Sequence, residues 1–531
     1  MADEASIIRN LATPFPPDRA SILALIRARL AERGNAKIEL SVDLPDEEAG
    51  QNPERLRFVA GALDALFGGQ DSSAKQTKAR TLVAAVTKVL RQPSNSAFEA
   101  LCRVIRNGKT NSIVDETLTR LIPELAQRRD ALSTLARRLI VEAPDVETVK
   151  MGIAILGISG EAADASLILE IGQSDEFTLY SAVALTNLLQ DSEGELWRLA
   201  KSVHGWGRIA VVERLAGTQN EQIKAWLLRD GFRNSIMYEY LAYIAATAGD
   251  MLQALSAPEI DDELLVASAE ILSALIIGGP AEQIEDYRDG PVACVAFLGH
   301  ALAREAPPLS VVSAVADIKR LGEDERTERL KALRDWSPQI FLDIRTRTAA
   351  FMQKPGVRAA VEAGLQSDEP WGQHFVAAQL APNFGIDAWP YHLDRQQRRI
   401  GENWWHLMQT NDPNRVDMVL ALAREQLNLA LVGSGPSRAL GIGPGYRDDG
   451  AVDFIVQDLR RFPGRGADFI DVGLRGRSVR LRHMAINALR DWGRERWPEG
   501  VESLVKAAML REPEQDVRDR MKLLLAGKLT D

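Results

Sequence analysis

Six histidines are the residues of this chain best suited to bind a metal ion or to move protons near neutral pH. They are His204, His300, His374, His392, His406 and His483. No two of them lie at the spacing of a metal-binding motif such as His-Glu-x-x-His together with a carboxylate. The sequence therefore predicts no metal site, although histidines that are distant in the chain can still converge in the fold.

A glycine- and proline-rich stretch at residues 433–447, GSGPSRALGIGPGYR, is a second place to look for chemistry. A phosphate-binding loop follows a strand, opens directly into a helix and often contains Gly-Lys-Ser or Gly-Lys-Thr. A helical pattern precedes this stretch, and no such tripeptide occurs in it. We interpret it as a loop. The chain also lacks the Gly-x-Ser-x-Gly elbow of serine hydrolases, so we predict no catalytic residue, no cofactor and no cofactor-binding residue.

Tryptophans gather around Trp404 and Trp405, with Trp371 and Trp389 nearby in the sequence. Large aromatic side chains on an exposed concave face anchor protein partners, whereas aromatics that point inward add apolar area to a core. We favour the core for this group and keep Trp404 and Trp405 as candidate partner-binding residues.

Trp206 and Arg208 are expected near the start of a helix that Ser202 or His204 would cap. They could contact a ligand, but packing between neighbouring helices explains them better. We keep both as candidates.

Arginines are densest between residues 460 and 482, where Arg475, Arg477, Arg480 and Arg482 are candidates for binding an acidic partner or phosphate. Aspartates at 453, 458, 468 and 471 interleave with them. Internal ion pairs are therefore the favoured use of these arginines.

Composition favours a helical protein without a membrane span. Of the 531 residues 46% are hydrophobic and only 6% aromatic, which suits helices better than a β-sandwich. The net charge of −10 argues against a general nucleic-acid binder. The most apolar run, at 264–278, is too short to cross a membrane and contains Glu270. Two distant cysteines and an acidic N-terminus suit a cytoplasmic protein.

A nine-residue frame ending in an aliphatic residue, with small or apolar residues at its fifth and sixth places, recurs along the chain. It occupies residues 148–156, 177–185, 207–215, 236–244, 264–272 and 294–302. The even spacing of about 30 residues is typical of stacked helical hairpins, since two short helices and two turns use that length. Residues 481–489, LRHMAINAL, and 372–380 repeat the frame later. We therefore predict an all-α chain.

This frame resembles the second helix of HEAT-type repeats, approximately Val-Arg-x-x-Ala-Ala-x-Ala-Leu, and residues 481–489 match it best. The short period is similar to the HEAT-like repeats of phycobilin-lyase proteins. The resemblance implies an armadillo-like α-solenoid, a superhelix of stacked antiparallel helix pairs. It covers residues 145–305 well and the ends more loosely.

The expected organisation is set by these patterns. Residues 1–52 would form an N-terminal arm (1–17), a helix (18–32), a possible short strand (37–42) and a loop. A helical region (53–144) precedes the regular repeats (145–305), which lead into irregular repeats (306–432), the Gly/Pro-rich loop (433–450) and a C-terminal helical cap (451–531). Within the second region we expect separate helices at 113–121 and 131–141, and Asp261 and Asp262 should cap the helix that follows them.

Three functions remain open from the sequence. The leading one is a non-catalytic scaffold that binds another protein. Residues 204–255, with HGWGRIAVVERL and RDGFRNS, also resemble bacterial proteins labelled limonene hydroxylase, which would imply a monoterpene mono-oxygenase; no haem, flavin or iron signature accompanies that resemblance. A HEAT-like DNA glycosylase is the third, and the net acidity counts against it.

Overall fold

The computed structural model describes residues 4–33, 72–323, 326–333, 335–369 and 372–530. Within these residues the regular elements are helices, no strand forms, and an isolated parallel bridge joins Ala439 to Ser478. The prediction of an all-α chain is thus confirmed for the described part. The strand expected at 37–42 and residues 53–71 of the expected helical region lie outside the described residues.

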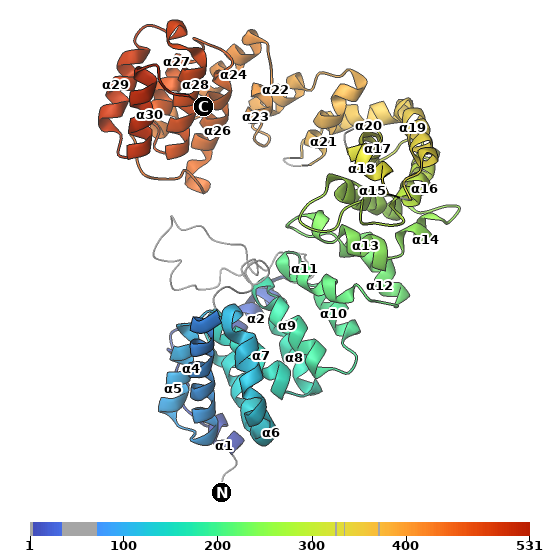
Figure 1. The fold of residues 1–531 in the computed structure, drawn as a ribbon, viewed down its shortest axis with the longest axis vertical. Helices are drawn as coiled ribbons and strands as arrows, with labels where there is room; N and C mark the ends of the chain where they lie inside the picture. The colour runs from blue at the N-terminus through green and yellow to red at the C-terminus, as the bar shows by residue number, and fades with distance from the viewer. Residues whose placement is uncertain (1–3, 34–71, 324–325, 334, 370–371, 531) are drawn as a thin grey trace. The chain divides into compact units, whose positions relative to one another are not determined.

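Contacts divide the chain into two compact units, Met1–Lys354 and Pro355–Asp531. The first unit contains α1 (Glu4–Arg9), α2 (Ile22–Arg33), α4 (Ser72–Arg91), α5 (Asn95–Arg106), α6 (Thr110–Glu142), α7 (Val146–Ser159), η1 (Ala162–Asp164), α8 (Ala165–Ile171), α9 (Asp175–Leu188), α10 (Glu193–Ala200), α11 (Trp206–Val212), η2 (Glu213–Leu215), α12 (Glu221–Trp226), η3 (Leu227–Gly231), η4 (Tyr238–Tyr240), α13 (Ala242–Ala248), α14 (Met251–Leu255), α15 (Asp262–Ile277), α16 (Gly290–Ala303), α17 (Leu309–Leu321), α18 (Arg326–Lys331) and α19 (Pro338–Met352) (Figure 1).

The N-terminal residues differ from the arm expected at residues 1–17. Residues 4–9 form α1, which packs against α6 and buries Ile8. Nη1 of Arg138, on α6, donates to the carbonyl oxygen of Ile8 at 2.7 Å. A helix of six residues is too short to be stable alone or to show an apolar period. The prediction of an arm was wrong because packing against α6 stabilises α1. The next helix was expected to begin at residue 18 and begins at Ile22.

α6 contains both helices expected at 113–121 and 131–141, joined across a kink. A break remains between the two predicted segments, because Arg128 has non-helical backbone angles, φ −139° and ψ 40°. The apolar pattern therefore located two helical segments correctly, and their near-continuity was not visible in it.

The first three copies of the frame lie in helices that stack on one another. Residues 148–156 lie in α7, 177–185 in α9, and 207–215 in α11 and η2. α7 packs against α9, and α9 packs against α11. At Gly157 a Cβ atom would lie 2.9 Å from Cα of Ala184. The small residues thus let α7 and α9 approach closely.

The later copies do not continue this row. Residues 236–244 do not form one helix, because Oδ1 of Asn234 accepts from the backbone N–H groups of Ile236 and Met237 at 2.9 and 2.8 Å in a turn. Residues 264–272 and 294–302 lie in α15 and α16. However, α15 packs chiefly against α17, and α16 packs chiefly against α19. An even spacing in sequence therefore corresponds to more than one packing arrangement.

The second unit consists of shorter helices and a compact C-terminal group. It contains α20 (Pro355–Leu365), α21 (Gln373–Leu380), η5 (Ala381–Phe384), α22 (Trp389–Gln397), α23 (Trp404–Met408), α24 (Pro413–Gln426), α25 (Leu429–Val432), η6 (Pro444–Tyr446), α26 (Arg447–Leu459), α27 (Ala467–Leu474), α28 (Val479–Trp492), η7 (Arg494–Arg496), α29 (Val501–Arg511) and α30 (Gln515–Leu525). α28 packs against α26, α27 and α30. Among the residues described in both units, no helix combines the length and apolarity needed to span a bilayer.

Candidate interaction groove

α4, in the N-terminal part of the chain, is a strongly basic helix. It carries Lys75, Lys78, Arg80, Lys88 and Arg91 and has no acidic residue. Residues 72–110 together hold eight basic residues and a single acidic one, whereas the whole chain has a net charge of −10. This local excess was not predicted from the sequence, in which arginines are denser after residue 460. A running net charge, rather than a count of arginines, would have revealed it.

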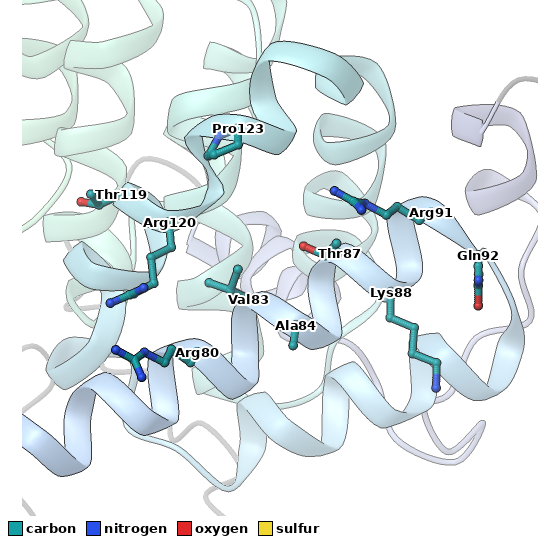
Figure 2. Close-up of a pocket in the computed structure, with 10 residues that line it drawn as sticks. All are labelled: Arg80, Val83, Ala84, Thr87, Lys88, Arg91, Gln92, Thr119, Arg120 and Pro123. Atoms are coloured by element: carbon teal, nitrogen blue, oxygen red, sulfur yellow. The ribbon is translucent and has the colours of Figure 1, made fainter.

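An open groove of about 720 Å³ lies between α4 and α6 (Figure 2). Its floor is apolar or small, and its ends are basic. The floor residues are Val83, Ala84, Thr87 and Pro123, and the cations are Arg80, Lys88, Arg91 and Arg120. Figure 2 shows Arg80 and Arg120 near each other, with Lys88 and Arg91 farther along α4. The groove can therefore receive an apolar surface that carries negative charge at both ends.

Helical periodicity explains why these side chains share one face. Arg80, Val83, Ala84, Thr87 and Lys88 follow one another at intervals of three, one, three and one residues, so they form one stripe on α4. The opposite stripe, which includes Leu82 and Val86, is buried in the unit's core.

Pro123 shapes the other wall of the groove. It stands inside α6 and has no N–H group, so the carbonyl of Thr119, four residues earlier, lacks its intrahelical hydrogen bond. Both residues line the groove. This wall therefore lacks a backbone donor at Pro123.

The groove's cations differ in how they are already paired. Arg91 forms an ion pair with Glu124, which also pairs with Arg128 at 3.1 Å. Arg120 pairs with Glu116 one turn earlier on α6. Within the part of the chain that the structure describes, no carboxylate pairs with Arg80 or Lys88, and both are exposed. These two cations remain available to an incoming anionic group.

The predicted arginines of the second unit are used differently, because each has an acidic partner. Arg475 pairs with Asp471 at 2.7 Å, Arg477 with Asp449 at 2.7 Å, Arg480 with Asp453 at 3.4 Å and Arg482 with Glu512 at 2.8 Å. Arg480 keeps 56% of its side chain exposed. Burial raises the pKa of its partner Asp453 to about 6.

Three of these arginines also hold the Gly/Pro-rich loop. Nη1 of Arg475 donates to the carbonyl of Gly433 at 3.0 Å, and Nη2 of Arg477 donates to that of Gly445 at 2.6 Å. Nη2 of Arg482 donates to the carbonyl of Ser437 at 2.9 Å. The loop thus presents its carbonyl oxygens to guanidinium groups of the same unit. These guanidinium donors hold the loop in its conformation.

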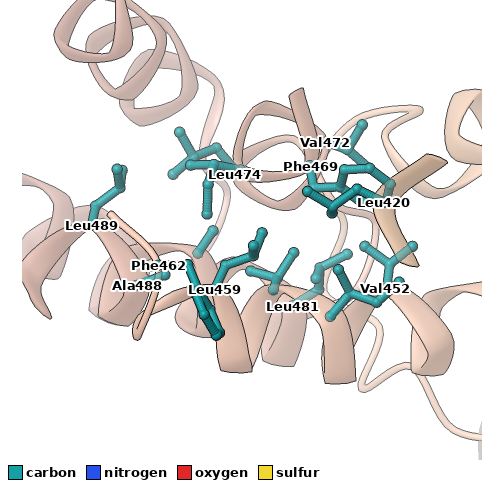
Figure 3. Packing of buried hydrophobic residues seen from close by; sticks show 14 of the residues in the cluster. Leu420, Val452, Leu459, Phe462, Phe469, Val472, Leu474, Leu481, Ala488 and Leu489 are labelled. Atoms are coloured by element: carbon teal, nitrogen blue, oxygen red, sulfur yellow. The ribbon is translucent and has the colours of Figure 1, made fainter. Parts of the chain in front are cut away.

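Arg482 and Glu512 form the most buried ion pair of the second unit, with both side chains fully inaccessible. They lie beside a core built from α22 to α30, part of which is shown in Figure 3. Leu481 and Leu489, on either side along α28, belong to that core. Arg482 therefore joins α28 to the segment before α30 and has no surface to offer a partner.

Trp206 and Arg208 are also packed inside the protein, with 8% and 3% of their surfaces exposed. The rings of Trp206 and Tyr240 lie 5.1 Å apart. Nη2 of Arg208 donates to Oδ2 of Asp230 at 2.7 Å and to its carbonyl at 2.9 Å. Both residues tie α11 to the turns that follow it.

The cap of α11 comes from a residue of α9, which is distant in the sequence. Oδ1 of Asp175, at the start of α9, accepts from the backbone N–H groups of Gly205 and Gly207 at 3.1 and 2.8 Å. The hydroxyl of Ser202 instead donates to the carbonyl of Leu199. The expected local cap by Ser202 or His204 was therefore wrong, because a carboxylate 30 residues away reaches the same amides.

The two adjacent tryptophans point to different surroundings. Trp404 is 2% exposed and belongs to the core of the second unit, whereas Trp405 is 44% exposed. Trp389 is buried beside them, and its indole N–H donates to the carbonyl of Leu407 at 2.9 Å. Trp371 lies outside the described residues. Of the predicted aromatic candidates, Trp405 has surface to offer.

Three histidines converge on α21, α22 and α23, as the sequence could not show. Nδ1 of His374 lies 2.9 Å from the carbonyl of Leu365 and must donate to it, so Nε2 of His374 accepts from Nδ1 of His392 at 2.9 Å. The rings of His392 and His406 stack with their centroids 4.6 Å apart. Among the described residues, no group of three or more His, Cys, Asp or Glu side chains is arranged to hold a metal ion. The cluster is held by hydrogen bonding and ring stacking, with His374 and His392 buried and His406 half-buried.

Comparisons with known proteins add no family to this picture. No family model matches the chain, and no curated protein and no solved structure matches it either. The candidate site therefore rests on the groove's own residues.

Proposed function

We propose that this chain is a non-catalytic scaffold of the HEAT-like, armadillo-like α-solenoid type, which binds a partner protein in the cytosol. The stacking of α7, α9 and α11 supports the repeat architecture, since each hairpin buries its apolar face against the next. Both cysteines are free and buried, in keeping with a reducing compartment.

The observation that carries the binding function is the groove between α4 and α6. Exposed lysine and arginine side chains flank an apolar floor there, and an apolar centre with a charged rim is the common anatomy of a protein interface. A solenoid offers such surfaces on rigid helices, so little conformational entropy is lost when a partner binds.

Cross-linking of the purified full chain in a lysate of its source organism, followed by mass spectrometry, tests this function. We expect one partner to be enriched, with cross-links to Lys88 or to neighbouring lysines of α4. The Arg80→Glu/Lys88→Glu double variant should lose that enrichment. If purified protein instead hydroxylated a monoterpene such as limonene, and no partner was enriched under any condition, the scaffold function would be wrong.

A further inference from the structure

We infer that the groove between α4 and α6 binds an acidic amphipathic helix of the partner, with two carboxylates about two turns apart and apolar residues between them. This inference rests on the proposed scaffold function and specifies its ligand. It follows from the charge of the groove, the spacing of its cations and the residues of its floor.

The charge of the groove selects an anionic occupant. Arg80 and Lys88 are exposed and have no described carboxylate as partner, while Arg91 and Arg120 are held by Glu124 and Glu116. Arg91 and Arg120 line the groove although each is already paired. Arg80 and Lys88 are free to pair with a ligand. An apolar or cationic segment would leave these charges without a counterpart.

The spacing of the cations selects a helix. Arg80 and Lys88 are eight residues apart on α4, which corresponds to about 12 Å along a helix axis. Carboxylates at positions i and i+7 of a second helix are about 10.5 Å apart on one face, and two long cationic side chains cover the difference. Positions i+3 and i+4 of that helix then face the floor of the groove.

The floor of the groove explains why the ligand helix should carry apolar residues between its two carboxylates. Val83, Ala84 and Thr87 separate the two free cations, and Pro123 faces them from α6. Small and branched side chains at these positions let another helix approach to ordinary packing distance, about 8–10 Å between axes. Leucines at i+3 and i+4 of the ligand would therefore be buried from solvent against the floor.

The same floor disfavours a nucleic acid. Duplex DNA presents one negative charge about every 1.7 Å of its axis and is bound by a continuous row of cations. On α4 the middle of the groove carries no cation between Arg80 and Lys88. Moreover, a chain of net charge −10 repels a polyanion beyond the groove.

Fluorescence anisotropy with the full chain tests the inference. The probe is a labelled 16-residue helical peptide with glutamates at i and i+7 and leucines at i+3 and i+4. We expect saturable binding that weakens as salt is added. A peptide of equal composition, with its glutamates moved to the opposite face, should bind about 10-fold more weakly, as expected for loss of close charge pairs.

Charge reversal within α4 supplies a matched control. Arg80→Glu/Lys88→Glu should weaken the peptide about 10-fold or more, while Lys75→Glu/Lys78→Glu, with the same charge change on the same helix but outside the groove, should weaken it less than about 3-fold by long-range effects alone. A peptide with lysines at i and i+7 should regain binding to the Arg80→Glu/Lys88→Glu variant. Circular dichroism should show equal helix content in both variants.

Several outcomes would overturn the inference. These are equal losses in the two double variants, no rescue by the lysine peptide, and tighter binding of a duplex or single-stranded oligonucleotide than of the peptide. Salt-sensitive self-association that only the groove variant abolishes would assign the groove to a second copy. A rise in affinity when Asp46, Glu47 and Glu48 are changed to amides would assign it to the chain's own acidic stretch. If cross-linking still enriches a partner with the groove variant, the scaffold function stands and the groove assignment fails.

Discussion

Nε2 of His374 lies 2.9 Å from Nδ1 of His392, and both rings are buried. His374 donates its other nitrogen to the carbonyl of Leu365 at 2.9 Å. The hydrogen bonds are thus complete with both rings neutral. Burial lowers the pKa of His392 to about 3, helped by His406 and His374 and by Arg395, and burial also lowers the pKa of His374 and of His406.

We therefore expect α21, α22 and α23 to lose stability in mild acid. Below about pH 6.5 the unfolded histidines bind protons, while folded His392 stays neutral down to about pH 3. Stability contributed by the neutral ring is complete above pH 6.5 and falls between these values, by about 1.4 kcal/mol per pH unit for one histidine. Hydrogen exchange of these helices at pH 7.0 and 5.5, corrected for intrinsic rates, measures it. The dependence should flatten in His392→Gln; an unchanged dependence would show that other groups cause it.

The site of Gly207 has no room for a side chain, so we expect a substitution there to be destabilising. A Cβ atom there would lie 2.5 Å from Oγ1 of Thr178 and 2.7 Å from Oδ1 of Asp175, the carboxylate that caps α11. Gly207→Ala should destabilise α9 and α11 by about 1–3 kcal/mol, as overpacking does. Gly194→Ala is the control, since nothing lies within 4 Å of its Cβ position in α10. It should stabilise its helix by about 0.5–1 kcal/mol. Local hydrogen exchange measures both, and equal effects would contradict the close contact.

Removing one member of the buried Arg482–Glu512 pair should be costly. Glu512→Ala leaves a guanidinium group charged and fully buried, so we expect a loss of about 3–5 kcal/mol. Asp468→Asn breaks the half-exposed pair with Arg424, and this change should cost about 0.2–1 kcal/mol. The shift of the unfolding transition of the second unit, followed by calorimetry, compares the two. A small effect of Glu512→Ala would mean that water reaches Arg482 after local rearrangement.

Both cysteines should resist modification in the folded protein. Cys102 and Cys294 are buried, and burial raises the pKa of each thiol to about 12. Since the thiolate is the reactive form, a disulfide reagent such as DTNB at pH 8 should release no chromophore from native protein within minutes. Two equivalents should react in denaturant. Fast reaction of one thiol in native protein would reveal an opening of α5 or α16.

Local signals in the sequence predicted those helices whose apolar residues recur at helical spacing and whose ends are marked by capping residues or glycine. Of the two aspartates expected to cap α15, Asp261 does so, because its Oδ1 accepts from the backbone N–H of Leu264 at 2.7 Å. Asp262 is instead the first residue of the helix. Gly278 ends the same helix with a positive φ of 75°. These features act within a turn of the chain, so the residue types suffice to predict them. The superhelical solenoid itself stays a prediction.

Contacts between distant residues decided the rest. The sequence by itself determined that helices form, where many of them begin and end, and that charge is unevenly distributed. Only the tertiary structure decided that α1 is helical, that Asp175 caps α11, that His374 meets His392, and that the frame helices pack in more than one row. It also decided which cations form ion pairs within the chain, as the arginines from Arg475 to Arg482 do, and which remain exposed and unpaired within the described residues, as Arg80 and Lys88 do. The physical reason is that a pairing energy depends on distance and burial in three dimensions, which a linear pattern of residue types does not contain.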